Sequence, residues 1–154
     1  VVASTVDDMT SIQQTRTVAQ KMGVKPGLRA YLRDAPATAV TAMGLPDLDV
    51  PETLTGELEY LHLFVVTQDR LREQFGELRD RLRPGGMLWV SWPKGGKLGT
   101  DLTIKSVIAI GYELNMVEST CLRMDEVWSG LKFTHPKPGK TYANSYGTLP
   151  DQRT

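Results

Sequence analysis

Two short apolar runs constrain the fold of this chain most strongly. Residues 58–66 (LEYLHLFVV) and residues 87–92 (MLWVSW) are apolar at successive positions, as strands are when helices cover both faces of their sheet. Between them, residues 67–83 repeat apolar side chains at helical spacing, Thr67 is a good N-cap, and a Pro-Gly-Gly turn follows. A strand, a helix and a strand in this order predict a parallel βαβ unit.

The same alternation continues on both sides of this unit. We expect helices at residues 11–22 and 35–44, a strand at residues 28–34 and one brief strand near residues 48–50. A further helix should begin at Thr100 and Asp101, which are good N-terminal residues. Residues 116–135 then read as two strands joined near residues 124–126. The pattern predicts an α/β fold: a three-layer αβα sandwich with a mostly parallel, Rossmann-like sheet that ends in an antiparallel hairpin.

Length and periodicity predict a single domain. The 154 residues, 40% of them apolar, suffice for one hydrophobic core, which we assign to residues 11–135 after an N-terminal extension at residues 1–10. Residues 136–154 lose periodicity and form an extended tail with Tyr142, Tyr146 and Leu149 as its expected anchors. We expect the tail to pack along its own domain or across a homodimer interface, with the homodimer slightly favoured.

Charge and composition limit the classes of binding partner and the cellular compartment that we expect for this chain. Eighteen basic residues balance eighteen acidic ones, so no overall field attracts nucleic acid or an anionic membrane. No apolar run approaches the ~18 residues of a membrane span, and the first ten residues lack the pattern of a signal peptide. The single cysteine, Cys121, excludes an intramolecular disulfide framework. These features favour a cytoplasmic protein.

The order of elements resembles a shortened class I S-adenosylmethionine (SAM)-dependent methyltransferase fold over roughly residues 25–135. The sharpest segment is LRDRLRPGGMLWVSWPK, which is similar to the helix, Pro-Gly-Gly turn and fifth strand of those enzymes. More closely, the segments KMGVKPG, HLFV, LRPGGMLWVSWPK, TDLT and EVWSGLKF resemble a family of small bacterial proteins that carries only a domain-of-unknown-function label.

The methyltransferase resemblance implies a cofactor site that this sequence matches only in part. Such enzymes place a glycine-rich loop after the first strand, where the cofactor approaches the backbone, but residues 28–43 contain no glycine. An acidic residue after the second strand usually holds the ribose hydroxyls, and Asp47, Asp49 and Glu52 are the candidates. We therefore predict a non-catalytic binding or regulatory domain with no cofactor. The alternatives are a SAM-dependent methyltransferase or another small-ligand enzyme.

Few residues have the pattern of a catalytic or metal site. Cys121 has no histidine near it in sequence and is expected to be a small buried hydrophobe. His62 interrupts an apolar strand, where a core histidine bonded to backbone or a carboxylate is favoured over a general base. No metal-binding, nucleophile-elbow or P-loop spacing occurs, so no metal is expected.

The corner after the strand at residues 87–92 is the predicted ligand site. Ligands of open α/β sheets bind outside the carboxyl ends of the strands, and a helix N-terminus favours anions. An antiparallel last strand would bring residues of the hairpin to the same corner. The predicted site comprises Ser91, Trp92, Lys94, Lys97, Thr100, Trp128 and Ser129. It would suit a small anionic or phosphorylated aromatic compound, and a peptide carboxylate would also fit. The alternative is that the tryptophans only close the sheet edge and the lysines are solvated.

Overall fold

The computed structural model describes residues 16–142 and 146–150, so the expected extension at residues 1–10 lies outside the described residues. Five strands form one sheet in the order β1-β2-β3-β5-β4. The strands are β1 (Ala30–Arg33), β2 (Leu58–Phe64), β3 (Leu82–Pro93), β4 (Val117–Arg123) and β5 (Trp128–Thr134). The helices are α2 (Val18–Met22), α3 (Ala37–Met43), α4 (Gln68–Arg79), the 3-10 helix η1 (Lys94–Gly99) and α5 (Ile104–Glu113).

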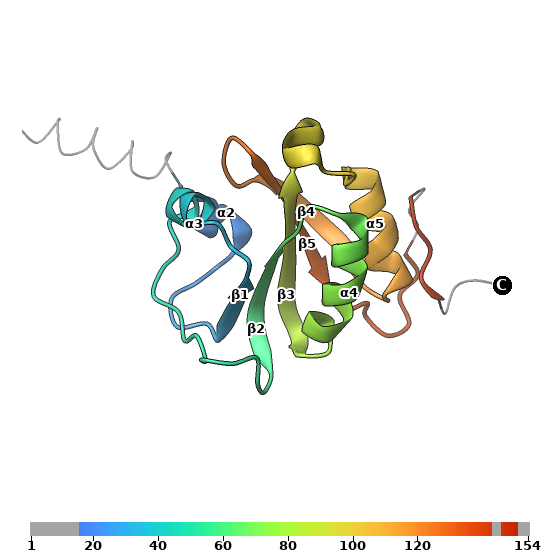
Figure 1. Cartoon of the computed structure of the whole chain (residues 1–154). Coiled ribbons are helices and arrows are strands. Elements are labelled where there is room, and N and C mark those ends of the chain that lie inside the picture. The colour runs from blue at the N-terminus through green and yellow to red at the C-terminus, as the bar shows by residue number, and fades with distance from the viewer. Residues whose placement is uncertain (1–15, 143–145, 151–154) are drawn as a thin grey trace, which may run out of the picture.

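The sheet is the middle of three layers. Helices α2 and α3 cover one face, and α4 and α5 cover the other (Figure 1). Strands β1, β2 and β3 are parallel, while β5 is antiparallel to both β3 and β4. This arrangement confirms the expected sandwich with its terminal hairpin.

Both faces of the central strands are buried, as their composition predicts. In β2, Tyr60 and Phe64 belong to the apolar cluster under α2 and α3, whereas Leu61 and Leu63 belong to the cluster under α4 and α5. Successive side chains of a strand point to opposite faces, so an uninterrupted apolar run serves both layers at once.

The Pro-Gly-Gly segment lies inside β3 and does not form a turn before it. Helix α4 ends at Arg79, earlier than expected, because the Leu58 amide already donates to the Arg81 carbonyl and β3 begins at Leu82. A Cβ on Gly86 would lie 3.0 Å from the Glu59 carbonyl oxygen, so only glycine lets β3 approach β2 so closely.

The brief strand expected near residues 48–50 is a single parallel bridge between Asp49 and Arg29. The tail packs on its own domain where the structure describes it. Leu149 is buried in the cluster under α5, and Gly147 lies against Tyr112 of that helix. None of the described helices is long and apolar enough to cross a membrane.

Candidate functional site

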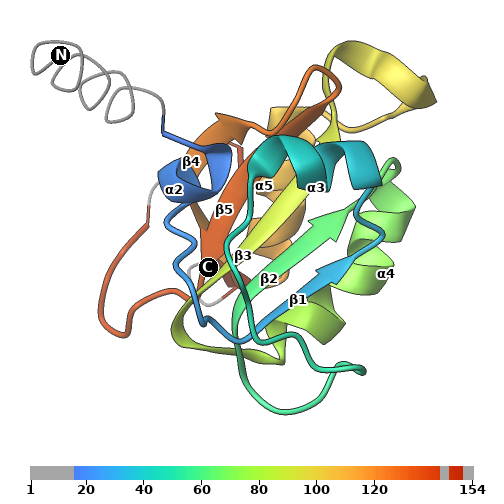
Figure 2. The same ribbon diagram turned by 90° about the vertical axis from the view of Figure 1, so that its left-hand side faces the viewer.

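The parallel strands β1, β2 and β3 end at one edge of the sheet (Figure 2). Beyond β3, a cavity of about 460 Å³ opens between η1, the start of α5 and the β4–β5 hairpin. Three of the residues predicted for a ligand site line this cavity: Trp92, Lys94 and Ser129. Its other lining residues are Gly95, Gly96, Leu102, Thr103, Ile104 and Cys121.

Two predicted site residues lie on the opposite face of the sheet. Ser91 precedes Trp92 in an extended strand, so its side chain points under α2 and α3, and the same alternation separates Trp128 from Ser129. Ser91 is fully buried, and the Trp128 ring packs edge-on against Phe64 at a centroid distance of 5.2 Å. Neither residue can share the cavity with Trp92.

The remaining predicted residues, Lys97 and Thr100, hold loops together. The Lys97 ammonium donates to the Glu126 carbonyl at 3.0 Å, which ties η1 to the hairpin. The Thr100 hydroxyl donates to the carbonyl of Val66, just beyond β2. A second hydrogen bond joins the segment after β2 to the segment after η1, since the backbone amide of Gln68 donates to the Asp101 carboxylate at 2.9 Å.

The expected anion site at a helix start near Thr100 is corrected by the structure. Helix α5 begins at Ile104 and is capped by Thr103. The Thr103 hydroxyl accepts from the Ser106 amide at 3.2 Å, and the Ser106 hydroxyl accepts from the Thr103 amide at 2.9 Å. This reciprocal capping uses two of the amides that an anion would need.

The charge at the cavity is cationic with acidic neighbours. Desolvation contributes most to lowering the pKa of Lys94, and the nearby positive charges of Arg123 and Lys97 lower this pKa further. Asp125 and Glu126 act in the opposite direction. The Lys94 ammonium is therefore the cationic group of the cavity wall, at a place where cations gather.

Cys121 differs from its prediction. Its thiol is free and exposed on the edge strand β4, where it lines the cavity. Partial burial nevertheless raises the pKa of the Cys121 thiol. The thiol is therefore accessible but not activated as a nucleophile.

A buried polar chain lies under α2 and α3. The Tyr60 hydroxyl is 2.7 Å from Nδ1 of His62, and Nε2 of His62 is 2.7 Å from the Ser91 hydroxyl. All three residues have no exposed surface, and burial lowers the pKa of His62 to about 3. His62 is thus a neutral core histidine, as favoured, but its partners are two hydroxyls and not backbone or a carboxylate.

The turn after β1 makes a sharp bend without glycine. Asp34 has a φ of 58°, in the left-handed region, and Pro36 is the N-cap of α3 two residues later. Aspartate is one of the few non-glycine residues that adopt this conformation readily. The absence of glycine therefore does not exclude a tight turn at this edge.

The acidic residues proposed for the ribose lie elsewhere. Asp49 forms a backbone β-bridge with Arg29, and the Asp47 carbonyl accepts from the Gly27 amide. Both aspartates therefore lie at the amino end of β1 and not at its carboxyl end near Asp34. The structure thus corrects the expected place of Asp47 and Asp49. No group of three or more metal-ligating side chains gathers among residues 16–142 and 146–150.

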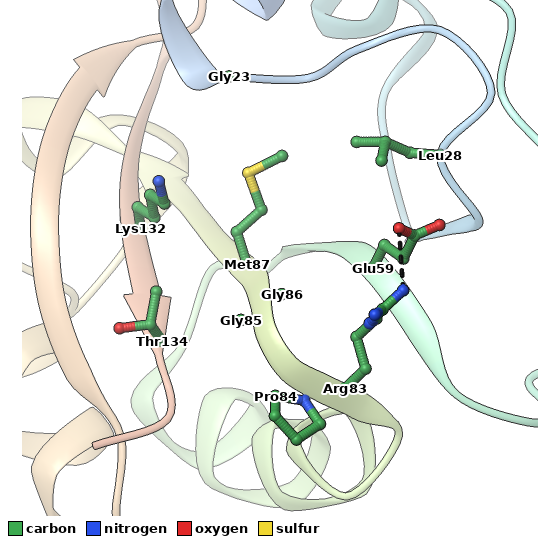
Figure 3. A pocket seen from close by; sticks show the side chains of 10 residues that line it. All are labelled: Gly23, Leu28, Glu59, Arg83, Pro84, Gly85, Gly86, Met87, Lys132 and Thr134. Carbon is green, nitrogen blue, oxygen red and sulfur yellow. Dashed lines mark hydrogen bonds and ion pairs between the residues drawn. The ribbon is translucent and has the colours of Figure 1, made fainter. Parts of the chain in front are cut away.

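A second cavity of about 460 Å³ lies at the amino end of β3, around Met87 and the Pro-Gly-Gly segment (Figure 3). Its charged groups Glu59 and Arg83 pair with each other at 3.3 Å, and Lys132 stands across the cavity from them. This is the edge opposite to the one where α/β sheets bind ligands.

No protein-family model and no curated protein sequence matches the chain. Among solved structures, it is similar to a ribosomal protein L11 methylase from Lactobacillus delbrueckii subsp. bulgaricus, with a TM-score of 0.50 and 14% identity over 78% of this chain and 75% of that one. It is also similar to LepI in complex with SAM, with a TM-score of 0.50 and 10% identity over 77% of this chain but only 39% of LepI.

These similarities show a methyltransferase-like α/β fold, and they overturn the prediction of a non-catalytic domain with no cofactor. The fold is shared with a protein described as a methylase and with one solved in complex with SAM. That prediction rests on the absence of glycine after the first strand, where Asp34 nevertheless forms a left-handed turn.

Proposed function

We propose that this chain is a SAM-dependent methyltransferase that binds its cofactor at the carboxyl edge of β1 and β2. The observation that supports this most is the sheet order, with an antiparallel β5 between β3 and β4, in a fold similar to that of the L11 methylase. The bacterial family of unknown function remains a prediction from sequence segments alone.

The residues at this edge fit such a cofactor in one respect. Asp34 turns the chain sharply at the end of β1, and only the small or compact residues Ala35, Pro36 and Ala37 follow it. A short side chain beside a tight turn leaves the backbone open to close approach by a ligand, as glycine does in larger enzymes. Asp34 also brings a carboxylate to the end of β1, where it lies 3.5 Å from the Arg70 guanidinium.

In a second respect the fit differs from that of larger enzymes. The segment that holds Asp47 and Asp49 pairs at the amino end of β1, through backbone hydrogen bonds with Gly27, Leu28 and Ala30. This pairing brings neither aspartate to the carboxyl edge. Asp34 and Thr67, which follow β1 and β2, are the polar residues we assign to cofactor binding.

Methyl transfer suits a site without a strong general base. SAM, when bound, supplies a methyl group on a positively charged sulfur, so the protein mainly has to bind and orient the reactants. Both histidines are otherwise engaged: His62 is buried, and Nε2 of His135 is 2.8 Å from the Leu82 carbonyl oxygen. Hydrolysis of a stable bond, which needs an accessible base, is less well supported by these residues.

The test is calorimetric titration of the chain with SAM and with its demethylated product, S-adenosylhomocysteine. We expect saturable binding, and weaker binding by Asp34→Asn, which keeps the left-handed turn but removes the carboxylate. Asp49→Asn, at the opposite edge, is the matched control and should bind as the unchanged chain does. Absence of saturable heat with either compound, together with an unchanged melting temperature, would contradict the proposal.

A further inference from the structure

The cavity at the carboxyl end of β3 is separate from the edge assigned to the cofactor. It lies under η1 and beside the start of α5, which stand together at the end of β3 (Figure 1). The contacts of Thr100 with Val66 and of Asp101 with Gln68 lie between this cavity and the end of β2. A molecule in the cavity would therefore not need to displace one bound beside Asp34.

The walls of the cavity are largely apolar. Trp92 and Leu102 form its buried part, and Ile104 is 41% exposed although it begins a helix whose inner face is well packed. A volume of about 460 Å³ is within the range of small-molecule sites. An apolar body would gain contacts here that water cannot offer.

Cations stand on one side of these apolar walls. Lys94 lines the cavity, and Arg123 and Lys97 are close enough to disfavour its charge. None of the ion pairs among the described residues includes Lys94. The nearby Asp125 carboxylate is held by the amides of Val127 and Trp128, from which it accepts at 2.8 and 2.7 Å, and it forms no ion pair with Lys94. An anion from outside the chain would complement this cluster.

The loop beside the cavity is held in an unfavourable conformation. Leu98 has a φ of 55° and is 64% exposed, so an apolar side chain is displayed to solvent from a left-handed backbone. Residues kept in such a conformation cluster at ligand sites. This loop also supplies Gly95 and Gly96 to the cavity wall.

We propose that this cavity is a second ligand site, which binds a small molecule with a flat apolar body and one anionic group. Trp92, Leu102 and Ile104 contact the apolar body, and Lys94 pairs with the anion. This inference goes beyond methyl transfer, since it uses none of the residues assigned to the cofactor.

Two dyes of matched shape test the proposal. Anilinonaphthalene sulfonate carries an aromatic body and one anion, and N-phenyl-1-naphthylamine carries the same rings without the anion. We expect the sulfonate dye to bind at one site per chain and the neutral dye to bind more weakly. The substitution Lys94→Gln should weaken binding of the sulfonate dye about fivefold, the effect of one solvent-accessible ion pair, and leave binding of the neutral dye unchanged.

Cys121 reports the place of binding without any mutation. It is the only cysteine of the chain and lines the cavity, so its rate of alkylation by iodoacetamide, followed by mass spectrometry, should fall as the sulfonate dye saturates its site. Lys132→Gln, in the cavity at the opposite edge of the sheet, is the matched control and should leave both readouts unchanged.

Three outcomes would overturn this second site. They are equal affinity of the sulfonate dye for the unchanged chain and for Lys94→Gln, an unchanged rate of Cys121 alkylation at saturating dye, and loss of binding in Lys132→Gln. A melting temperature of Lys94→Gln equal to that of the unchanged chain shows that any effect is local. SAM titrations are independent of these readouts, so the two proposals fail separately.

Discussion

Asp34 combines a backbone requirement with a chemical one. Its φ of 58° is tolerated by asparagine and glycine but not by β-branched residues. We expect Asp34→Val to lower the free energy of unfolding by about 1–2 kcal/mol, because valine must adopt the left-handed conformation. Asp34→Asn should differ by less than about 0.5 kcal/mol, since it loses only an exposed ion pair with Arg70. Urea denaturation measures both values, and equal losses in the two variants would show that the conformation is not the cause.

His62 should make stability depend on pH. Its pKa is about 3 in the folded chain, against 6.5 for an ordinary histidine, so only the unfolded chain binds the proton between these values. The contribution of His62 to the free energy of unfolding is fully present above pH 6.5. It falls by about 1.4 kcal/mol per pH unit as the pH decreases toward 3.

The variant His62→Gln isolates this effect. At pH 7.5 it should be less stable than the unchanged chain, because hydrogen bonds with Tyr60 and Ser91 are lost or distorted. As the pH is lowered from 6.5 to 4.5, the difference between the two chains should shrink, as followed by urea denaturation at each pH. Parallel stability curves would mean that His62 is protonated in the folded chain.

Single residues also show what the sequence could and could not reveal. Thr103 and Ser106 have the spacing of reciprocal capping, so the sequence contains a signal for the observed start of α5. The prediction instead placed this helix start at Thr100 and Asp101. The separation of Ser91 from Trp92 follows from strand alternation alone. Tyr60 lies two residues before His62 in β2, so its place on the same face also follows from alternation. Ser91 did not follow as a partner, because it depends on the register in which His62 of β2 lies beside Trp89 of β3.

At the scale of elements, the contact of α5 with β5 is set by one glycine. A Cβ on Gly111 would lie 2.1 Å from Cε1 of Phe133, whose ring packs edge-on against Phe75. Alanine would improve helix propensity by about 1 kcal/mol, but forcing the helix away from the sheet costs about 1–3 kcal/mol or more. We expect Gly111→Ala to lower the melting temperature.

A second substitution tests this explanation. In a chain that already carries Phe133→Leu, the ring edge is gone, and Gly111→Ala should be much less destabilising. A double-mutant cycle by urea denaturation should give a coupling energy of about 1–3 kcal/mol. Additive effects would show that Gly111 is needed for another reason.

Elements were predictable where their pattern was strong. The apolar runs of β2 and β3 and the start of the helix between them agree with the prediction, since burial on both faces leaves a clear signal. The extension of β3 back to Leu82 was missed, because Pro-Gly-Gly normally signals a turn. Here Gly86 allows close pairing with Glu59, a long-range effect with no local signature.

At the scale of the whole molecule, the tail is part of the core. Leu149 is buried against the α5 side of the sheet, so Leu149→Ala should lower the free energy of unfolding by about 2–3 kcal/mol. If the tail packs on its own domain, light scattering should give the same mass for this variant and for the unchanged chain. A change of mass would instead support the homodimer that the sequence analysis favoured. An unchanged melting temperature would show that Leu149 does not stabilise the fold.

The position of β5 has a consequence for how the chain is made. It is later in the sequence than every other strand, yet it lies inside the sheet, between β3 and β4. Until residue 134 has left the ribosome, β3 has an open edge and β4 has no neighbour in the sheet. Such edges invite pairing with other chains. Residues up to 134 must therefore be synthesised before this sheet can close, so the open strand edges persist on the nascent chain until then.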